Sequence, residues 1–378
     1  MQDLSKSLAR LKQQHRYRQV KTRLGPQDHT IEVNGQRLLN FCSNDYLGLS
    51  NHPKVLDAFI PAAKHYGVGS GASHLINGHT DAHDKLERAL AKWSGREKAL
   101  LYSTGYMANL GIASGLLNAQ SAVFEDRLNH ASLIDAGLMA KSRFKRFAHL
   151  DMQALEKQLS QSEARTKMIM TDGIFSMDGD AAPLAKLSQL AQKYQAWLMV
   201  DDAHGVGLLG DTGAGLVEQA QLNSADVPIL VYTFGKAIGT SGACVVGDAD
   251  LIDTLVQHSR SYVYTTAMPP AIAAATEQSI QIIQTETWRK QQLHDNIALF
   301  KQLLQEHNIS TQSDSAIQPI LIGSDENALA ASQALNNAGI MVSAIRPPTV
   351  PEGTARLRIT LSAFHQTTHI EQLVDVLS

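Results

Sequence analysis

Between residues 79 and 247, short apolar runs alternate with segments of helical periodicity, and this alternation restricts the fold more than any other feature of the chain. Helical stretches separate the first five runs, which is the arrangement of a mostly parallel sheet covered by helices on both faces. The last two runs are joined too tightly for a helix and are expected to pair antiparallel. We therefore predict an α/β fold with a mostly parallel seven-stranded sheet between helices, its strands at residues 98–103, 122–126, 144–149, 167–175, 197–203, 228–234 and 242–247.

The two ends of the chain are expected to lie outside that sheet. Leucines recur at helical spacing over residues 4–11, and Asn34-Gly35 predicts a hairpin turn because both residues tolerate positive φ. After Pro269-Pro270 comes a long helical stretch and then an α+β segment. We predict a small C-terminal domain that the N-terminal segment completes, with regions at 1–45 (helix and hairpin), 46–265 (large domain) and 266–378 (small α+β domain).

Composition excludes several classes of protein. Hydrophobic residues make up 44% of the chain and charged residues 18%, with a net charge of −3, which argues against a disordered chain and against a polybasic nucleic-acid binder. No apolar run is long enough to cross a bilayer, so we expect no membrane partner and a cytoplasmic protein. The two cysteines give no disulfide framework, and the 15 histidines show no ligand spacing with an acidic partner, so no metal site is expected.

Ligands of open α/β sheets bind beyond the carboxyl ends of the strands, where three residues of this chain are chemically unusual. Asp201 directly follows an apolar run, and a buried carboxylate is costly unless a cation or strong donors pair with it. His204 follows three residues later and can share its ligand, although a structural ion pair is an alternative. Lys236 follows another buried run between small or apolar residues, which makes it a candidate for a nucleophilic amine, with a loop lysine that reaches solvent as the alternative.

Other strand ends offer weaker signals. Ser103-Thr104-Gly105-Tyr106 opens a helix whose free N–H groups suit a phosphate, although an ordinary helix cap is the simpler interpretation. His130 and Ser176 follow two further strands and could stack on or bond to a planar ligand, or else be a capping residue and a turn residue. The glycine-rich run 67–71 follows no strand, so it does not predict a dinucleotide site, and no phosphate-binding GxxxxGK[ST] loop occurs.

Together these groups match the needs of pyridoxal 5′-phosphate. An amine can hold its aldehyde, a carboxylate can keep its pyridine nitrogen protonated, and a helix end can bind its phosphate. Each signal is weak alone, but their joint appearance at successive strand ends favours this cofactor.

Several motifs of the chain resemble those of the α-oxoamine synthases, fold-type I pyridoxal-phosphate enzymes that condense an amino acid with an acyl thioester and release CO₂. The similarity extends from about residue 4 to the C-terminus. The motifs that carry it are NFCSNDYLGL at 40–49, NHASL at 129–133, FSMDG at 175–179, DDAHG at 201–205, TFGK at 233–236 and TTAMPP at 265–270.

The resemblance implies a role for each matching residue. Catalysis falls to Lys236, which holds the cofactor and moves the substrate proton, together with Asp201 and His130. Further contacts to the cofactor fall to Gly105, Tyr106, Ser176, His204 and Thr233, with Thr265 or Thr266 reaching the phosphate from the partner subunit of a homodimer. Substrate binding falls to Arg346 and Asn44 at the amino-acid carboxylate, to His130, and to Arg18 and Thr349 at the acyl group, with Arg16 and Lys21 competing for the place of Arg18.

The segments AIRPPTVP at 344–351 and GTARLR at 353–358 are similar to those of the branch that joins L-alanine to a pimeloyl thioester. The carrier of that acyl group, coenzyme A or an acyl carrier protein, stays open. A sister enzyme that uses glycine or serine with another acyl-CoA is the nearest alternative, and a non-catalytic pyridoxal-phosphate-binding regulatory protein is the alternative from a different class.

Overall fold

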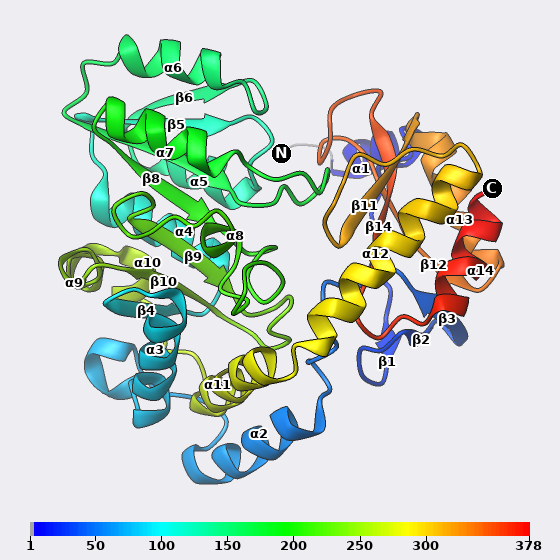
Figure 1. Ribbon diagram of the computed structural model, residues 1–378, viewed down its shortest axis with the longest axis horizontal. Helices are drawn as coiled ribbons and strands as arrows, with labels where there is room; N and C mark the ends of the chain where they lie inside the picture. The colour runs from blue at the N-terminus through cyan, green and yellow to red at the C-terminus, as the bar shows by residue number, and fades with distance from the viewer. Residues whose placement is uncertain (1–3) are drawn as a thin grey trace. The chain divides into compact units, whose positions relative to one another are not determined.

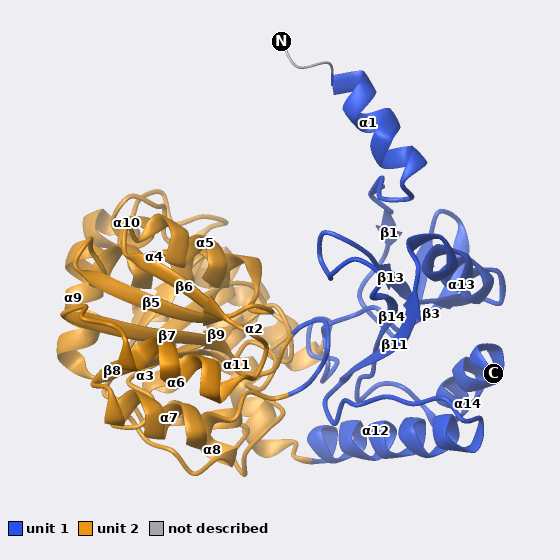
Figure 2. Ribbon diagram, turned by 90° about the horizontal axis from the view of Figure 1, so that it is seen from above, with its two compact units in different colours: residues 1–51, 176–180, 288–378 blue, residues 52–175, 181–287 orange. Residues whose placement is uncertain are grey.

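The computed structural model describes residues 4–378, which divide into two compact units (Figure 2). Unit 1 comprises the described residues up to Asn51, residues 176–180 and Trp288–Ser378; unit 2 comprises His52–Phe175 and Ala181–Thr287. The N-terminal segment therefore shares a unit with the C-terminal one. The units differ from the expected regions at residues 46–51, which join unit 1, and at residues 266–287, which join unit 2 because α11 (Pro270–Thr285) contacts α2 (Pro53–Tyr66) and α3 (Asp81–Ser94).

Unit 2 is built on a seven-stranded sheet in the order β4-β10-β9-β8-β7-β5-β6, which confirms the predicted α/β fold (Figure 1). Strand β10 pairs antiparallel with β4 and β9, and the other neighbours are parallel. The strands are β4 (Lys98–Tyr102), β5 (Ser121–Asp126), β6 (Arg143–Phe147), β7 (Thr166–Asp172), β8 (Ala196–Asp201), β9 (Ile229–Thr233) and β10 (Ala243–Gly247).

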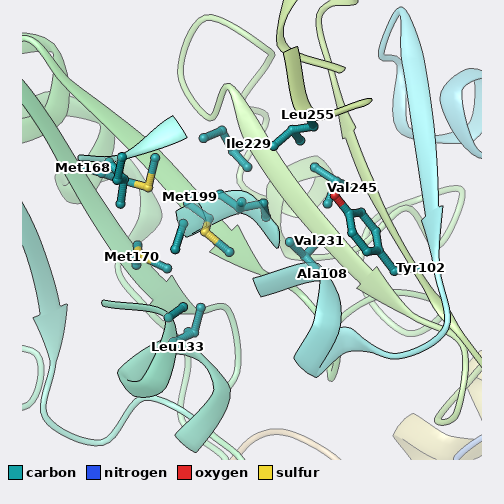
Figure 3. Close-up of a cluster of buried hydrophobic side chains, with 14 of the residues drawn as sticks. Tyr102, Ala108, Leu133, Met168, Met170, Met199, Ile229, Val231, Val245 and Leu255 are labelled. Atoms are coloured by element: carbon teal, nitrogen blue, oxygen red, sulfur yellow. The ribbon is translucent and has the colours of Figure 1, made fainter. Parts of the chain in front are cut away.

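Helices cover both faces of this sheet, as Figure 2 shows. On one face, α4, α5 and α9 join the strands in a core that includes Ala108, Leu133, Met199, Val231 and Leu255 (Figure 3). On the other, α6 and α7 contact strands β5 to β8. These helices are α4 (Gly105–Leu116), α5 (Ala131–Met139), α6 (Met152–Ser160), α7 (Leu184–Lys193) and α9 (Ala249–His258), and two single-turn helices are α8 (Leu216–Gln219) and α10 (Arg260–Val263).

Unit 1 contains two small sheets and the terminal helices. The predicted hairpin is confirmed: β2 (Thr30–Val33) and β3 (Gln36–Asn40) pair antiparallel around Asn34 and Gly35, whose φ angles are 52° and 78°. One sheet has the order β1-β2-β3-β12 and the other β11-β14-β13. The remaining elements are α1 (Leu4–Gln13), β1 (Arg23–Leu24), α12 (Trp288–Glu306), β11 (Ile317–Gly323), α13 (Asp325–Asn337), β12 (Ile340–Met341), β13 (Ser343–Ile345), β14 (Ala355–Thr360) and α14 (Thr367–Leu377).

Several predicted strands run past their observed ends, and the strand expected at 167–175 does so most. The expected strand at 167–175 ends at Asp172, because the chain bends there and Ile174 forms an isolated bridge with Ala181. The long helical stretch after Pro270 is two helices, α11 and α12, rather than one. Within residues 4–378, no helix combines the length and apolar character needed to cross a bilayer.

Candidate active site

Asp201 is the last residue of β8 and is 5% exposed. Its Oδ2 atom accepts a hydrogen bond from Asn109 Nδ2 at 2.7 Å, and its Oδ1 atom accepts one from the Ala203 backbone N–H at 3.1 Å. Asn109 Nδ2 also donates to Ser132 Oγ at 2.8 Å. These neutral donors hold the Asp201 carboxylate in place.

Lys236 lies in the tight loop between β9 and β10. Its Nζ atom donates to Thr233 Oγ1 at 3.2 Å. The loop is closed by backbone bonds from Phe234 N to Gly242 O (2.9 Å) and from Thr240 N to Phe234 O (2.8 Å). The amine is therefore placed by the sheet itself and by a loop with its own internal hydrogen bonds.

The N-terminus of α4 lies beside Thr233. Thr104 caps this helix by accepting a hydrogen bond from Met107 N at 3.1 Å. A Cβ atom added to Gly105 would lie 2.5 Å from Thr233 Cγ2, so glycine is what allows this close approach. Free N–H groups of a helix end and the amine of Lys236 thus share one neighbour, Thr233.

His130 is the N-cap of α5, as its position in the sequence predicts. Its Nδ1 atom is 2.7 Å from Ser132 Oγ, and its backbone N–H donates to Asp172 Oδ2 at 2.7 Å. Desolvation lowers the pKa of the His130 imidazole, Lys236 acts in the same direction, and Asp201 opposes them. The three predicted catalytic groups therefore lie close enough to influence one another electrostatically.

Two residues of this cluster, Asn109 and Asp172, were not among the predicted site residues. Asn109 sits one helical turn after Gly105, and nothing in the sequence distinguishes it from an ordinary core-facing position. Asp172 is the Cα partner of Asp201 on the neighbouring strand, and its pKa is raised by burial and then by the charge of Asp201. The signal for Asp172 was present, but the strand prediction continued past it to residue 175.

The other predicted residues of unit 2 have separate positions. Tyr106 donates through its hydroxyl to Asp135, and its ring lies edge-on to His130 with 6.5 Å between centroids. His204 is buried, close behind Asp201 in the chain. Thr265 and Thr266 follow α10, and Thr266 forms an isolated antiparallel β-bridge with Ser73. The role of these threonines across a dimer stays a prediction.

In unit 1, Arg18, Arg346 and Thr349 line one cavity of about 70 Å³, so the structure brings the two predicted acyl contacts together with Arg346. Arg18 Nη2 donates to Thr349 Oγ1 at 3.1 Å, and Arg346 Nη1 donates to the carbonyl of His15. The Nε atom of Arg346 is buried without a hydrogen-bond partner among the described residues. Arg16 lines the same cavity.

Asn44 and Ser176 share a different arginine. Arg358 on β14 donates from Nη1 and Nη2 to Asn44 Oδ1, each at 3.3 Å, and from Nε to the Ser176 carbonyl at 2.6 Å. It is 8% exposed. The sequence assigned the amino-acid carboxylate to Arg346 with Asn44, whereas in the structure Asn44 bonds to Arg358. The only signal for Arg358 in the sequence was its place as the last residue of the matching segment at 353–358.

Histidines also gather outside this cluster, although their spacing predicted no metal site. His74, His79 and His83 form one group, and His79, Asp84 and Glu87 form another, each with its possible ligand atoms within 4.8 Å of one another. In the first group both ring nitrogens of His83 already bond to protein atoms, Thr80 N and Met268 O.

Residues 36–377 match the family model described as aminotransferase class I and II, so the chain belongs to that family. More particularly, it is 52% identical to an 8-amino-7-oxononanoate synthase of Saccharophagus degradans, over all of this chain and 96% of the relative. It is 51% identical to the enzyme of the same name from Cellvibrio japonicus, over all of this chain and 95% of the relative.

Solved structures agree with this assignment. A serine palmitoyltransferase from S. paucimobilis with bound pyridoxal phosphate has a TM-score of 0.94 and 28% identity, covering 99% of this chain and 96% of that one. An 8-amino-7-oxononanoate synthase from Francisella tularensis has a TM-score of 0.79 and 29% identity, covering 90% of this chain and 96% of that one.

Proposed function

We propose that this chain condenses L-alanine with a pimeloyl thioester and releases CO₂, the free thiol and 8-amino-7-oxononanoate, a step of biotin biosynthesis. The observation that carries the proposal is the cluster of Lys236, Asp201 and His130 in a chain half identical to synthases of that name. It is supported further by Arg18, Arg346 and Thr349, which give the acyl chain a polar, cationic lining.

The donor set of unit 2 fits pyridoxal 5′-phosphate. Lys236 would hold its aldehyde carbon, Asp201 its pyridine nitrogen, and the α4 terminus with Thr233 its phosphate. Of unit 2, Tyr106, His130 and His204 are proposed to contact its ring, and Thr265 and Thr266 its phosphate from the partner subunit; the ring contact expected of Ser176, a residue of unit 1, stays a prediction. When bound, this cofactor stabilises negative charge at the substrate Cα by drawing it into the ring.

The protein's own groups then carry the remaining tasks. Lys236 Nζ accepts the proton from the alanine Cα and returns a proton to that carbon after CO₂ has left. Asp201, held by Asn109, is placed to pair with the protonated ring nitrogen. Because its pKa is lowered, the His130 imidazole is largely neutral. It can therefore stack on the protonated pyridine ring without charge repulsion.

Two arginines share the acidic parts of the substrates in this proposal. We assign the alanine carboxylate to Arg358, because its guanidinium is buried and already fixed by Asn44 and the Ser176 carbonyl. A planar guanidinium can bind a carboxylate through two parallel hydrogen bonds. Arg346 then belongs with Arg18 and Thr349 at the acyl group.

A sister reaction is the second candidate, because serine palmitoyltransferases are among the solved structures that this chain resembles in shape. In that case the same cluster would process serine with a longer acyl thioester. Sequence identity favours the first candidate. About half of the residues are identical to those of the curated 8-amino-7-oxononanoate synthases, against 28% for the palmitoyltransferase.

We also propose that the protein is a cytoplasmic homodimer. Three large apolar side chains of unit 2 support a second copy: Val68 is 92% exposed, Ile76 78% and Tyr264 74%, and apolar surface of this kind is commonly covered in an assembly. Cys42 and Cys244 are free, as in a reducing compartment. The acyl carrier, coenzyme A or an acyl carrier protein, is left open.

The test is a product assay. Purified protein supplied with pyridoxal 5′-phosphate is mixed with L-alanine and pimeloyl-CoA, and thiol release and product mass are measured. We expect 8-amino-7-oxononanoate from alanine, with glycine and serine far slower. Serine with palmitoyl-CoA as the preferred pair would move the assignment to the sister reaction, and no product from any pair would refute the proposal.

A further inference from the structure

His83 lies in the first turn of α3 and is fully buried, far along the chain from the predicted site residues. Its Nδ1 atom accepts a hydrogen bond from the Thr80 backbone N–H at 3.0 Å, which caps the helix. Because Nδ1 is an acceptor, Nε2 carries the proton of the neutral ring and donates it to the Met268 carbonyl at 2.7 Å. Burial lowers the pKa of His83, which favours the neutral ring, and the two hydrogen bonds select this tautomer.

The Met268 carbonyl accepts a second hydrogen bond, from Ser70 Oγ at 2.5 Å. The preceding residue is also held, since Ala267 N donates to Ala72 O at 3.0 Å. Two segments distant in sequence therefore fix the backbone of residues 267–268 before the start of α11. A carbonyl with two lone pairs can accept both donors at once.

The Met268 side chain reaches the loop of Lys236. A Cβ atom added to Gly242 would lie 3.1 Å from Met268 Cε and 3.0 Å from Phe234 Cδ2, so both side chains pack against Gly242. Gly242 O in turn accepts the hydrogen bond from Phe234 N that closes the loop. A continuous series of contacts thus joins His83 to the loop that positions the amine.

We propose that His83 is a positioning residue for Lys236: by holding the Met268 carbonyl, it seats the Met268 side chain against the loop at 234–242 and so sets the affinity of the protein for its cofactor. This inference rests on the proposed function for the identity of the cofactor. The positioning itself is a property of the protein alone, so it can be measured separately.

The chain offers a matched control. His365 in unit 1 is also buried, accepts at Nδ1 from Ser362 N (3.1 Å) and donates from Nε2 to the carbonyl of Asn40 (3.0 Å). It has the same tautomer and the same two kinds of partner as His83. His365→Leu therefore removes equivalent hydrogen bonds without touching the Met268 contact series.

Two measurements on the full-length protein test the proposal. In His83→Leu, amide hydrogen exchange without cofactor should accelerate in residues 234–242, and the Kd for pyridoxal 5′-phosphate should rise about tenfold, as expected for the loss of one buried hydrogen bond. His83→Gln, which can still donate to Met268, should recover most of the affinity. His365→Leu should leave the Kd and the exchange of the loop unchanged.

Ser70→Ala provides a milder variant, since it removes the other donor to the same carbonyl and leaves the α3 cap intact. It should raise the Kd in the same direction. The proposal is overturned if the loop exchanges at the wild-type rate in both the His83→Leu and Ser70→Ala variants, or if His365→Leu weakens cofactor binding as much as His83→Leu. Wild-type protein that fails to bind pyridoxal 5′-phosphate, while the loop still responds to His83→Leu, would refute the proposed function and keep the positioning role.

Discussion

Gly105→Ala is the substitution whose outcome the structure specifies most closely. The added methyl would lie 2.5 Å from Thr233 Cγ2, where ordinary contact begins near 3.4 Å. About 1 Å of movement is therefore required, and neither partner yields easily, because Thr233 is β-branched and ends a strand of the sheet. Overpacking of this kind costs roughly 1–3 kcal/mol, which exceeds the ~1 kcal/mol that alanine gains over glycine in a helix.

Movement of either side also has a chemical consequence. If Thr233 rotates, its Oγ1 atom leaves Lys236 Nζ, and if α4 shifts, its free N–H groups leave the proposed phosphate position. We expect Gly105→Ala to lower the free energy of unfolding by roughly 1 kcal/mol and to weaken pyridoxal-phosphate binding by about tenfold or more. Urea unfolding and titration with the cofactor measure these two quantities.

A second substitution, at Thr233, should reverse the effect of Gly105→Ala. Thr233→Ser removes Cγ2 and keeps the hydroxyl that bonds to Lys236, so Gly105→Ala combined with Thr233→Ser should regain most of the lost affinity. Gly69→Ala is the matched control, because nothing lies within 4 Å of its added Cβ atom. Wild-type stability and affinity in Gly105→Ala, or no recovery in the double variant, would refute the steric argument.

Other predictions concern charge. Lys236→Ala should retain the fold by circular dichroism and lose turnover by roughly 10³-fold or more, so near-normal turnover would rule out its role. Asp201→Asn should keep the fold and bind the cofactor but slow single-turnover rates roughly 10²-fold or more, and unchanged rates would contradict the ring-nitrogen argument. Arg358→Lys should raise the KM for alanine at least tenfold, whereas Arg346→Lys should act mainly on the acyl donor; the reverse pattern would return the carboxylate to Arg346. Burial raises the pKa of Glu125 to about 8, so the folded state keeps a proton that the unfolded state releases above pH 4.5, and folding stability from this group falls as pH rises from about 4.5 to 8. Glu125→Gln should therefore be more stable than wild type at pH 8 in urea unfolding and equally stable at pH 4; a difference independent of pH would argue against it.

The sheet, and the gathering of Lys236, Asp201 and His130, could be predicted because strand ends are encoded locally. Lys236, Asp201 and His130 each follow an apolar run, and parallel strands bring such ends to one edge. Asn109 and Asp172 were not found, since their importance comes from which neighbour the tertiary fold supplies: a carboxylate on the adjacent strand for Asp172, and that same carboxylate for Asn109.

The hydrogen-bond partners of the arginines could not be read from the sequence. Arg346 and Arg358 both lie in segments that carry the resemblance, and their partners differ: His15 for Arg346, and Asn44 and Ser176 for Arg358. The expected regions also placed α11 in the small C-terminal domain, whereas it belongs to unit 2. Helical periodicity does not reveal which unit a helix packs against. His83 carries no local sign of its distant partner Met268.

The division of the chain into units bears on how the protein is made. Unit 2 is almost continuous in sequence, so it can fold as soon as residue 287 leaves the ribosome. Strand β3 in contrast gains its neighbour β12 only when residues 340–341 emerge. At typical synthesis rates of 5–20 residues per second, that edge of the N-terminal sheet waits roughly 15–60 s without its partner. A ribosome that stalls between the end of unit 2 and β12 would hold a chain with a finished sheet in unit 2 and an open strand edge at β3, which is the part that chaperones would have to protect.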